Sequence, residues 1–251
     1  MGKDRYRRYH QSQDLSADYD KADTKTMAGA FFGRRHGKKL RQEQARGLAG
    51  LFPQLALDCS KPLVPESLFA TPRQGYWLEI GFGGGEHLLR NAQAHPEIGH
   101  LGCEPFINGL AKLVAAIGRD GLDNIRLHDD DALQVLDQLP DASLDRIYLL
   151  YPDPWPKRRH HKRRFVSDAM LGHFARVLKP GGLFCFASDI DHYVGWTLAR
   201  LLRSDDFDWC ADGPADWKVP WSGWQSTRYE AKALREGRAP SYITARRRSI
   251  G

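Results

Sequence analysis

Apolar positions from residue 75 onward follow two alternating patterns. Short continuous apolar runs predict buried strands, and longer segments with apolar residues at i, i+3, i+4 and i+7 predict amphipathic helices. The predicted strands, in chain order, are 76–80, 100–104, 124–130, 144–152 and 182–189. The predicted helices that follow them are 86–95, 108–118, 132–140, 167–179 and 191–204. Strands that alternate with helices of this length indicate βαβ units, and therefore a largely parallel sheet.

The C-terminal region is less regular. Residues 207–210 and 240–248 are predicted to form a closing pair of strands, and the tryptophan-rich segment 215–238 between them is predicted to be a loop. Asn108, at the start of the second helix, is a candidate cap. We therefore expect an α/β, doubly wound fold with a mostly parallel seven-stranded sheet and helices on both faces.

Charge is distributed unevenly along the 251 residues. The chain has 37 Lys and Arg against 31 Asp and Glu, and its net charge of +6 favours an anionic partner. The excess positive charge lies in the first 47 residues, in residues 157–164 and in Arg246, Arg247 and Arg248 near the C-terminus. Residues 1–47 lack hydrophobic periodicity and are predicted to be largely disordered in the free protein. We divide the chain into a basic, flexible extension over 1–50 and one folded domain over 51–251; a solvated tail without a role is the alternative for the extension.

Several classes of protein are disfavoured. No apolar run approaches the roughly 20 residues of a membrane helix, and the N-terminus has no secretory signal, so we expect a cytoplasmic protein without membrane contact. The four cysteines lie far apart and suggest neither a disulfide framework nor a zinc site. His160 and His161 are adjacent and flanked by cations, with no nearby acid to complete a site, so we expect no metal.

The loop after the first strand carries the first chemical signal. It reads EIGFGGG from Glu79 to Gly85. A dinucleotide-binding loop would have its third glycine at position 86, where this chain has Glu, and a carboxylate there would repel a pyrophosphate. The order E-x-G-x-G-x-G, with Gly81 and Gly83 inside it, resembles the first motif of Rossmann-like S-adenosylmethionine-dependent methyltransferases. Their cofactor presents a sulfonium and an ammonium instead of phosphates, so acids are favourable there.

Acids also follow the next two predicted strands. Glu104 is positioned to accept hydrogen bonds from ribose hydroxyls, and Asp131 from the adenine amino group, although Asp129 and Asp130 compete for the second role. In the alternative interpretation, the glycines only make a tight turn and the acids are solvated loop ends.

Further motifs make the resemblance specific. They are PDPWPK at 152–157, the RHHKRR that ends at Arg164, LEIGFGGGEH at 78–87 and STRYE at 226–230. Together they resemble the bacterial tRNA (guanine-N7)-methyltransferase family, over roughly residues 70–250. That family methylates a guanosine in the variable loop of tRNA, position 46 in tRNA numbering.

The resemblance implies a role for each matching position. Cofactor contacts would come from Glu79, Gly81, Gly83, Gly85, Glu104, Asp131 and Asp153. Asp153 would also be the catalytic residue of the active site, and substrate would contact Lys157, Asp189, Thr227, Arg228, Tyr229 and Glu230. The implied cofactor is S-adenosyl-L-methionine and the implied partner is tRNA; the sequence indicates no obligate protein partner.

The residue types of the PDPWPK motif and of the basic block after it also predict their roles on physical grounds. Prolines fix φ and remove backbone donors, so the motif is predicted to be a rigid, non-helical lip. Trp155 either stacks on an extruded purine or pins the loop to the body of the protein. Because guanine N7 carries no proton, we expect Asp153 to orient the base and offset charge, without abstracting a proton. The block is predicted to contact RNA phosphates, a solvated helix start being the alternative; its cations are Arg158, Arg159, Lys162, Arg163 and Arg164.

Two other functions compete with this one. An enzyme that methylates an exocyclic amine would need N/D/S-P-P-Y/F after the fourth strand, where this chain has Trp155 between prolines. A non-catalytic RNA-binding protein on a degenerate methyltransferase fold is disfavoured by the intact acids at the cofactor junctions.

Overall fold

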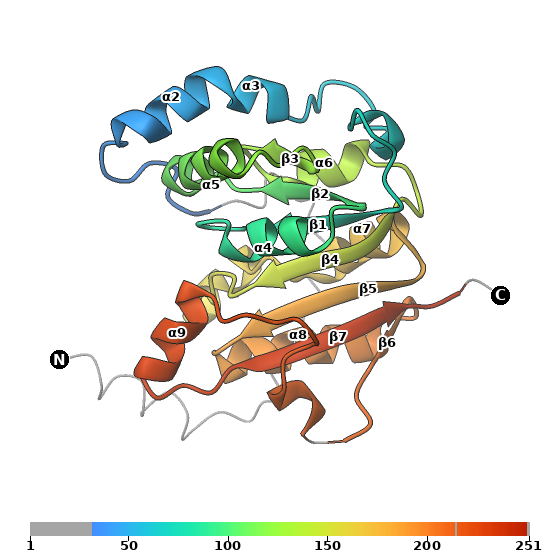
Figure 1. Cartoon of the computed structure of the whole chain (residues 1–251). Helices are drawn as coiled ribbons and strands as arrows, with labels where there is room; N and C mark the ends of the chain where they lie inside the picture. Colours follow the sequence, from blue (N-terminus) through green and yellow to red (C-terminus); the bar gives the residue numbers. More distant parts are fainter. Residues whose placement is uncertain (1–31, 214, 250–251) are drawn as a thin grey trace.

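The structure is a computed structural model that describes residues 32–213 and 215–249 (Figure 1). In this part of the chain, seven strands form one sheet in the order β3-β2-β1-β4-β5-β7-β6. Neighbours from β3 to β5 pair in parallel, and β7 runs antiparallel to both β5 and β6. The strands are β1 (Gly75–Ile80), β2 (Ile98–Cys103), β3 (Ile125–His128), β4 (Leu144–Leu150), β5 (Leu178–Ser188), β6 (Phe207–Trp209) and β7 (Ser241–Arg247). This confirms the predicted doubly wound sheet and its closing pair of strands.

Helices cover both faces of the sheet (Figure 1). One face carries α4 (Glu86–Ala94) and α5 (Ile107–Asp120), with α2 (Gln42–Gly50) and the short α3 (Phe52–Leu55) packed beyond them. The other face carries α6 (Ala132–Gln138), α7 (Asp168–Val177) and α8 (Asp191–Arg203). The remaining helical segments are α9 (Arg228–Arg235) and three 3-10 turns, η1 (Pro65–Ser67), η2 (Arg158–Arg163) and η3 (Asp216–Lys218). None of the helices described is both long and apolar enough to span a bilayer.

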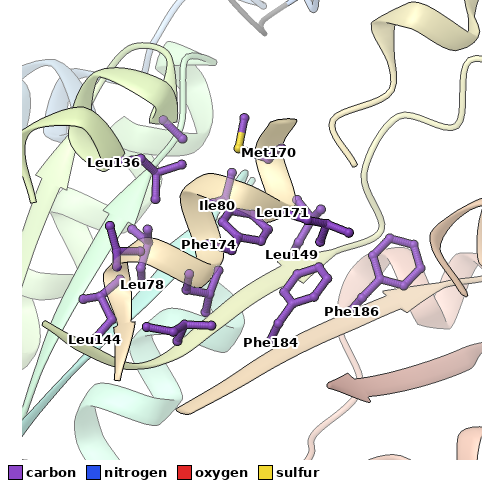
Figure 2. Packing of buried hydrophobic residues seen from close by; sticks show 14 of the residues in the cluster. Leu78, Ile80, Leu136, Leu144, Leu149, Met170, Leu171, Phe174, Phe184 and Phe186 are labelled. Carbon is purple, nitrogen blue, oxygen red and sulfur yellow. The ribbon is translucent and has the colours of Figure 1, made fainter. Parts of the chain in front are cut away.

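The largest core cluster lies between the sheet and α6, α7 and α8. Figure 2 shows Leu78 of β1, Leu149 of β4 and Phe184 of β5 facing Phe174 of α7. The rings of Phe174 and Phe184 lie 4.9 Å apart. Each such side chain, when fully buried, contributes about 1.5–3 kcal/mol, so this layer is a large part of what holds the helices on the sheet.

The tryptophan-rich segment has a structural role that its sequence did not indicate. Trp221 and Trp224 pack on a third apolar cluster formed by β4, β5 and β7, on the sheet face that also carries α4. They contact Tyr148 and Tyr242 through edge-on or tilted ring pairs. The prediction of a loop throughout 215–238 is wrong for 228–235, which form α9 with Thr227 as its N-cap.

The N-terminal extension is partly structured. Residues 1–31 lie outside the described residues, so the disorder predicted for them remains a prediction. For 42–47 that prediction is wrong, because these residues belong to α2, which packs on α5. The domain boundary at residue 50 also remains a prediction. The prediction that Asn108 caps α5 is wrong. Its side chain accepts from Gly37 N and donates to Lys38 O instead.

Candidate active site

A cavity of about 410 Å³ opens at the carboxyl ends of β1, β2 and β4. Its walls include both the glycine loop and the PDPW loop. Of the residues predicted to bind cofactor or substrate, those that line the cavity are Gly81, Gly83, Glu104, Asp131, Asp153 and Tyr229. The volume lies within the usual range for a small-molecule site, and the location is the one expected for a doubly wound sheet.

The glycine loop is held in a shape that side chains would obstruct. Gly83 has φ +57° and Gly85, the N-cap residue before α4, has φ +76°. A Cβ on Gly85 would lie 2.7 Å from Leu113. The loop also touches α5 closely, because a Cβ on Gly109 would lie 2.0 Å from the carbonyl oxygen of Gly83. Left-handed glycines and close backbone packing therefore form this wall of the cavity.

Glu104 is fixed at the end of β2. Its side chain accepts from Gly83 N at 2.5 Å and from Phe106 N at 2.9 Å, and the residue is 7% exposed. Burial raises the pKa of Glu104 despite these two hydrogen bonds. Each carboxylate oxygen has a second lone pair, so the group can still accept from a ribose diol.

Asp131 lies at the start of α6. Its side chain accepts from Leu133 N at 3.0 Å, which makes it the N-cap of that helix. Asp130 also lines the cavity and forms an ion pair with Arg35, whereas Asp129 is exposed and is not part of the lining. Of the three candidates for the adenine contact, Asp131 is therefore the one that is both buried and in the cavity wall.

The PDPW loop forms the opposite wall. Tyr151 and Trp155, on either side of Asp153, both have positive φ, +51° and +41°. A non-glycine residue in this conformation costs on the order of 1–3 kcal/mol. Asp153 is exposed at the cavity wall, and Trp155 lies 5.0 Å from the guanidinium of Arg163. The loop is thus strained around the predicted catalytic acid.

Comparisons with known proteins agree with this geometry. The family model described as "Putative methyltransferase" matches residues 73–241. A tRNA (guanine-N(7)-)-methyltransferase of Rhizobium etli is 59% identical over 222 residues, 87% of this chain and 96% of that protein. The same enzyme of Brucella melitensis is 57% identical over 223 residues, 88% and 96% of the two chains. This chain belongs to the tRNA (guanine-N7)-methyltransferase family.

Among solved structures the likeness is looser. The 16S rRNA methyltransferase KamB matches 70% of this chain and 89% of its own, with a TM-score of 0.48 and 15% identity.

Glu79, another of the predicted cofactor residues of this methyltransferase, does not line the cavity. Its carboxylate lies 2.6 Å from Nδ1 of His87 in α4, and both residues are buried. His87 in turn packs against the rings of Tyr148 and Trp224. The side chain of Glu79 therefore ties β1 to α4. Gly85 likewise lies outside the cavity lining and serves the turn into α4.

The predicted substrate motif TRYE divides into two pairs. Thr227 caps α9, and Glu230 is buried, where it accepts from Trp224 Nε1 at 2.7 Å and from the hydroxyl of Tyr242. Arg228 and Tyr229 are exposed and lie over the glycine loop, each with an atom 3.1 Å from where a Cβ of Gly83 would be. Only the second pair is available at the surface.

Lys157 and Asp189, the other predicted substrate residues, occupy different environments. Lys157 is exposed and immediately precedes η2. Asp189 follows β5 and pairs with Arg238, which also pairs with Glu236. Neither residue is part of the cavity lining.

The basic block is not uniform. Arg158, Arg159 and Lys162 are exposed on η2. Arg163 lines the cavity between Trp155 and Phe32, with its guanidinium 5.0 and 5.4 Å from the two rings. Arg164 is buried, so its predicted contact with phosphate does not fit its position.

The N-terminal segment contributes residues that sequence reasoning missed. Phe32, Gly33 and Arg34 line the cavity, and Phe32 meets Trp155 edge-on at 6.4 Å. The carbonyl of Arg35 accepts from Ile107 N at 2.9 Å. The available signal was the pair Phe31-Phe32 within an otherwise polar, basic segment.

Proposed function

We propose that this chain transfers a methyl group from S-adenosyl-L-methionine to N7 of a guanosine in tRNA, in the variable loop at position 46 of tRNA numbering. The observation that carries the proposal is the convergence of Glu104, Asp131 and Asp153 on one cavity, in a chain 59% identical to a tRNA (guanine-N(7)-)-methyltransferase. The cytoplasm is the compartment proposed with it. We infer no obligate protein partner.

The lining of the cavity fits a nucleoside that carries a positive charge. Glu104 is held by two backbone amides with lone pairs to spare for ribose hydroxyls, and Asp131 is buried in the wall beyond it. Backbone atoms of Gly81 and Gly83 form the floor. When bound, S-adenosylmethionine supplies an electrophilic methyl on its sulfonium. The acids of the wall favour that cation electrostatically, and the chain's contribution is orientation of donor and acceptor.

Asp153 is the group proposed to meet the guanine. Its carboxylate can accept from guanine N1-H and N2-H, which orients the ring and offsets the positive charge that develops on methylation. Because N7 already presents a lone pair, no proton needs to be removed from it. Trp155 lines the same cavity and also contacts Phe32 and Arg163, so both of its predicted roles, stacking on the base and pinning the loop, are consistent with its position.

The proposed RNA surface lies on two sides of the cavity. On one side are the exposed cations of η2, and on the other is α9, whose Arg228, Lys232 and Arg235 are exposed at i, i+4 and i+7. The one acid within α9, Glu230, is buried, so the outward face of this helix is cationic. Such a surface binds the sugar-phosphate backbone irrespective of base sequence.

The decisive test uses labelled S-adenosylmethionine and unmodified tRNA. We expect label to enter the tRNA at a site that is cleaved by borohydride and aniline, a treatment selective for 7-methylguanosine. Label that enters the RNA but resists this cleavage would instead support methylation of an exocyclic amine. Binding of tRNA with no binding of S-adenosylmethionine in calorimetry would support a non-catalytic RNA-binding protein.

A further inference from the structure

The PDPW loop is attached to the sheet at its start, where Tyr151 N donates to Ala187 O of β5 at 2.7 Å, but it has few further backbone donors. Pro152, Pro154 and Pro156 have no backbone N–H, so the loop has few donors with which to attach itself to the sheet. Its positive-φ residues, Tyr151 and Trp155, are strained and would relax if nothing held them. Beyond the Tyr151 amide, the backbone groups of the proline positions that remain available to an anchor are their carbonyl oxygens.

Arg164 provides such an anchor. Its Nε donates to the carbonyl oxygen of Pro154 at 2.9 Å, one residue beyond Asp153. Its Nη2 lies 2.9 Å from Nδ1 of His192 in the first turn of α8, and because arginine has no acceptor, that imidazole nitrogen must accept. The guanidinium also lies 5.1 Å from the ring of Tyr193 and 4.8 Å from that of Trp196.

These contacts join the loop to α8. The helix begins at Asp191, three residues after the end of β5 at Ser188, so one side chain couples the lip that presents Asp153 to the segment that follows the neighbouring strand. Arg164 is 4% exposed, and its packing between aromatic rings leaves its guanidinium away from a surface-bound RNA. Its chemistry is that of a fixed, planar donor with bonds in two directions.

We propose that Arg164 is a positioning residue for methyl transfer, which acts by locking the PDPW loop onto α8 so that Asp153 is held over the cavity, and not by contacting RNA phosphate. This inference rests on the proposed function. Lysine cannot replace the residue, because an ammonium on a flexible stem does not reproduce both directed hydrogen bonds together with the flat aromatic contacts.

The test compares Arg164→Lys and Arg164→Gln with Arg159→Gln, a matched loss of one cation from the exposed part of the same block. We expect both Arg164 variants to lower kcat at saturating tRNA by about 10- to 100-fold, with the salt dependence of tRNA binding unchanged. Arg159→Gln should instead raise KM for tRNA and reduce the salt slope by about 0.7–0.9. A reduced salt slope for Arg164→Gln, together with wild-type kcat in Arg164→Lys, would overturn the proposal.

A second measurement separates failure of this inference from failure of the proposed function. Hydrogen exchange over 157–165, followed in the absence of RNA, reports how firmly the basic block holds the loop, whatever reaction the protein catalyses. We expect faster exchange there in Arg164→Lys and in His192→Phe, and no change in Arg159→Gln. Unchanged exchange in both of the first two variants would overturn the anchor, whereas a wild-type protein that does not methylate tRNA would overturn the function alone.

Discussion

At the scale of single residues, the structure separates acids and cations that look equivalent in sequence. Glu104 lines the cavity, whereas Glu79 does not and pairs instead with His87 of α4. Arg159 is exposed and Arg164, five positions later, is buried. Residue type and spacing predicted that these side chains matter, but only their partners determine what each one does.

Asp153 is predicted to work by alignment and charge. We expect Asp153→Asn to lower the rate of methyl transfer by about 10²–10³, the range seen when one electrostatic contact to a developing charge is removed. The wild-type single-turnover rate should show no large solvent isotope effect, because no proton moves in the chemical step. A large normal effect would mean that a proton is in flight and would contradict this role.

His100 is predicted to make the protein sensitive to acid. Burial lowers the pKa of this imidazole to about 3, against about 6.5 in an unfolded chain. Below pH 6.5 the unfolded state binds a proton that the folded state does not, so the free energy of unfolding falls as pH falls. Between pH 7 and pH 5 we expect this histidine to lower the free energy of unfolding by about 2 kcal/mol, and His100→Gln should remove that loss.

Urea unfolding at several pH values measures this contribution. His36→Gln, at an exposed position, serves as the control and should leave the pH dependence as in the wild type. Equal pH dependence in His100→Gln and wild type would show that the buried histidine is not responsible.

At the scale of elements, the packing of α5 against the glycine loop decides the shape of the cofactor wall. Most helices and strands were predictable, because hydrophobic period and flanking glycines or prolines are local signals. The exceptions include α2 and α9, two short helices in polar or tryptophan-rich segments. The first packs on α5, and the second is held by contacts of Trp224 and Tyr242 with Glu230.

Gly109→Ala tests the contact between α5 and the glycine loop. The added methyl would lie 2.0 Å from Gly83 O, so one of the two segments must move. We expect a loss of about 1–3 kcal/mol in the free energy of unfolding, with weaker binding of S-adenosylmethionine in calorimetry. Gly172→Ala in α7 is the matched control: its Cβ would have no neighbour within 4 Å, and helix propensity favours alanine by up to about 1 kcal/mol.

The exposed cations of η2 are predicted to set the salt dependence of tRNA binding. We expect the double variant Arg158→Gln, Arg159→Gln to reduce the slope of log K against log salt by about one to two units. The control is Arg119→Gln with Arg203→Gln, which removes the same charge from the last turns of α5 and α8, outside the cavity lining. If both double variants change the slope equally, binding depends on net charge alone.

At the scale of the whole molecule, the cavity joins segments from both ends of the chain. Its walls extend from Phe32 to Tyr229 and surround the carboxyl ends of one sheet. A ligand held by so many segments should stabilise the described domain as a unit.

We expect one thermal transition, raised by about 5–10 °C when S-adenosylmethionine is present at 100 times its Kd, which corresponds to about 2.7 kcal/mol. Adenosine diphosphate at the same concentration should give a much smaller shift, because its phosphates would face the acids of the loop. Equal shifts by the two compounds would argue against a site selective for a cationic nucleoside.

The sequence by itself determined most of the strands and helices along the chain, the glycine loop and the positions of the acids that follow β2, β3 and β4. These features depend on local periodicity and on the rule that the carboxyl ends of parallel strands all lie at the same end of the sheet. Only the tertiary structure decided that Glu79 and Glu230 are held inside by other side chains, that residues 32–34 line the cavity, and that Arg164 faces inward. The reason is physical. Each of these outcomes depends on contacts with residues far away along the chain, and the local sequence pattern around a residue does not determine which distant residues it contacts in the fold.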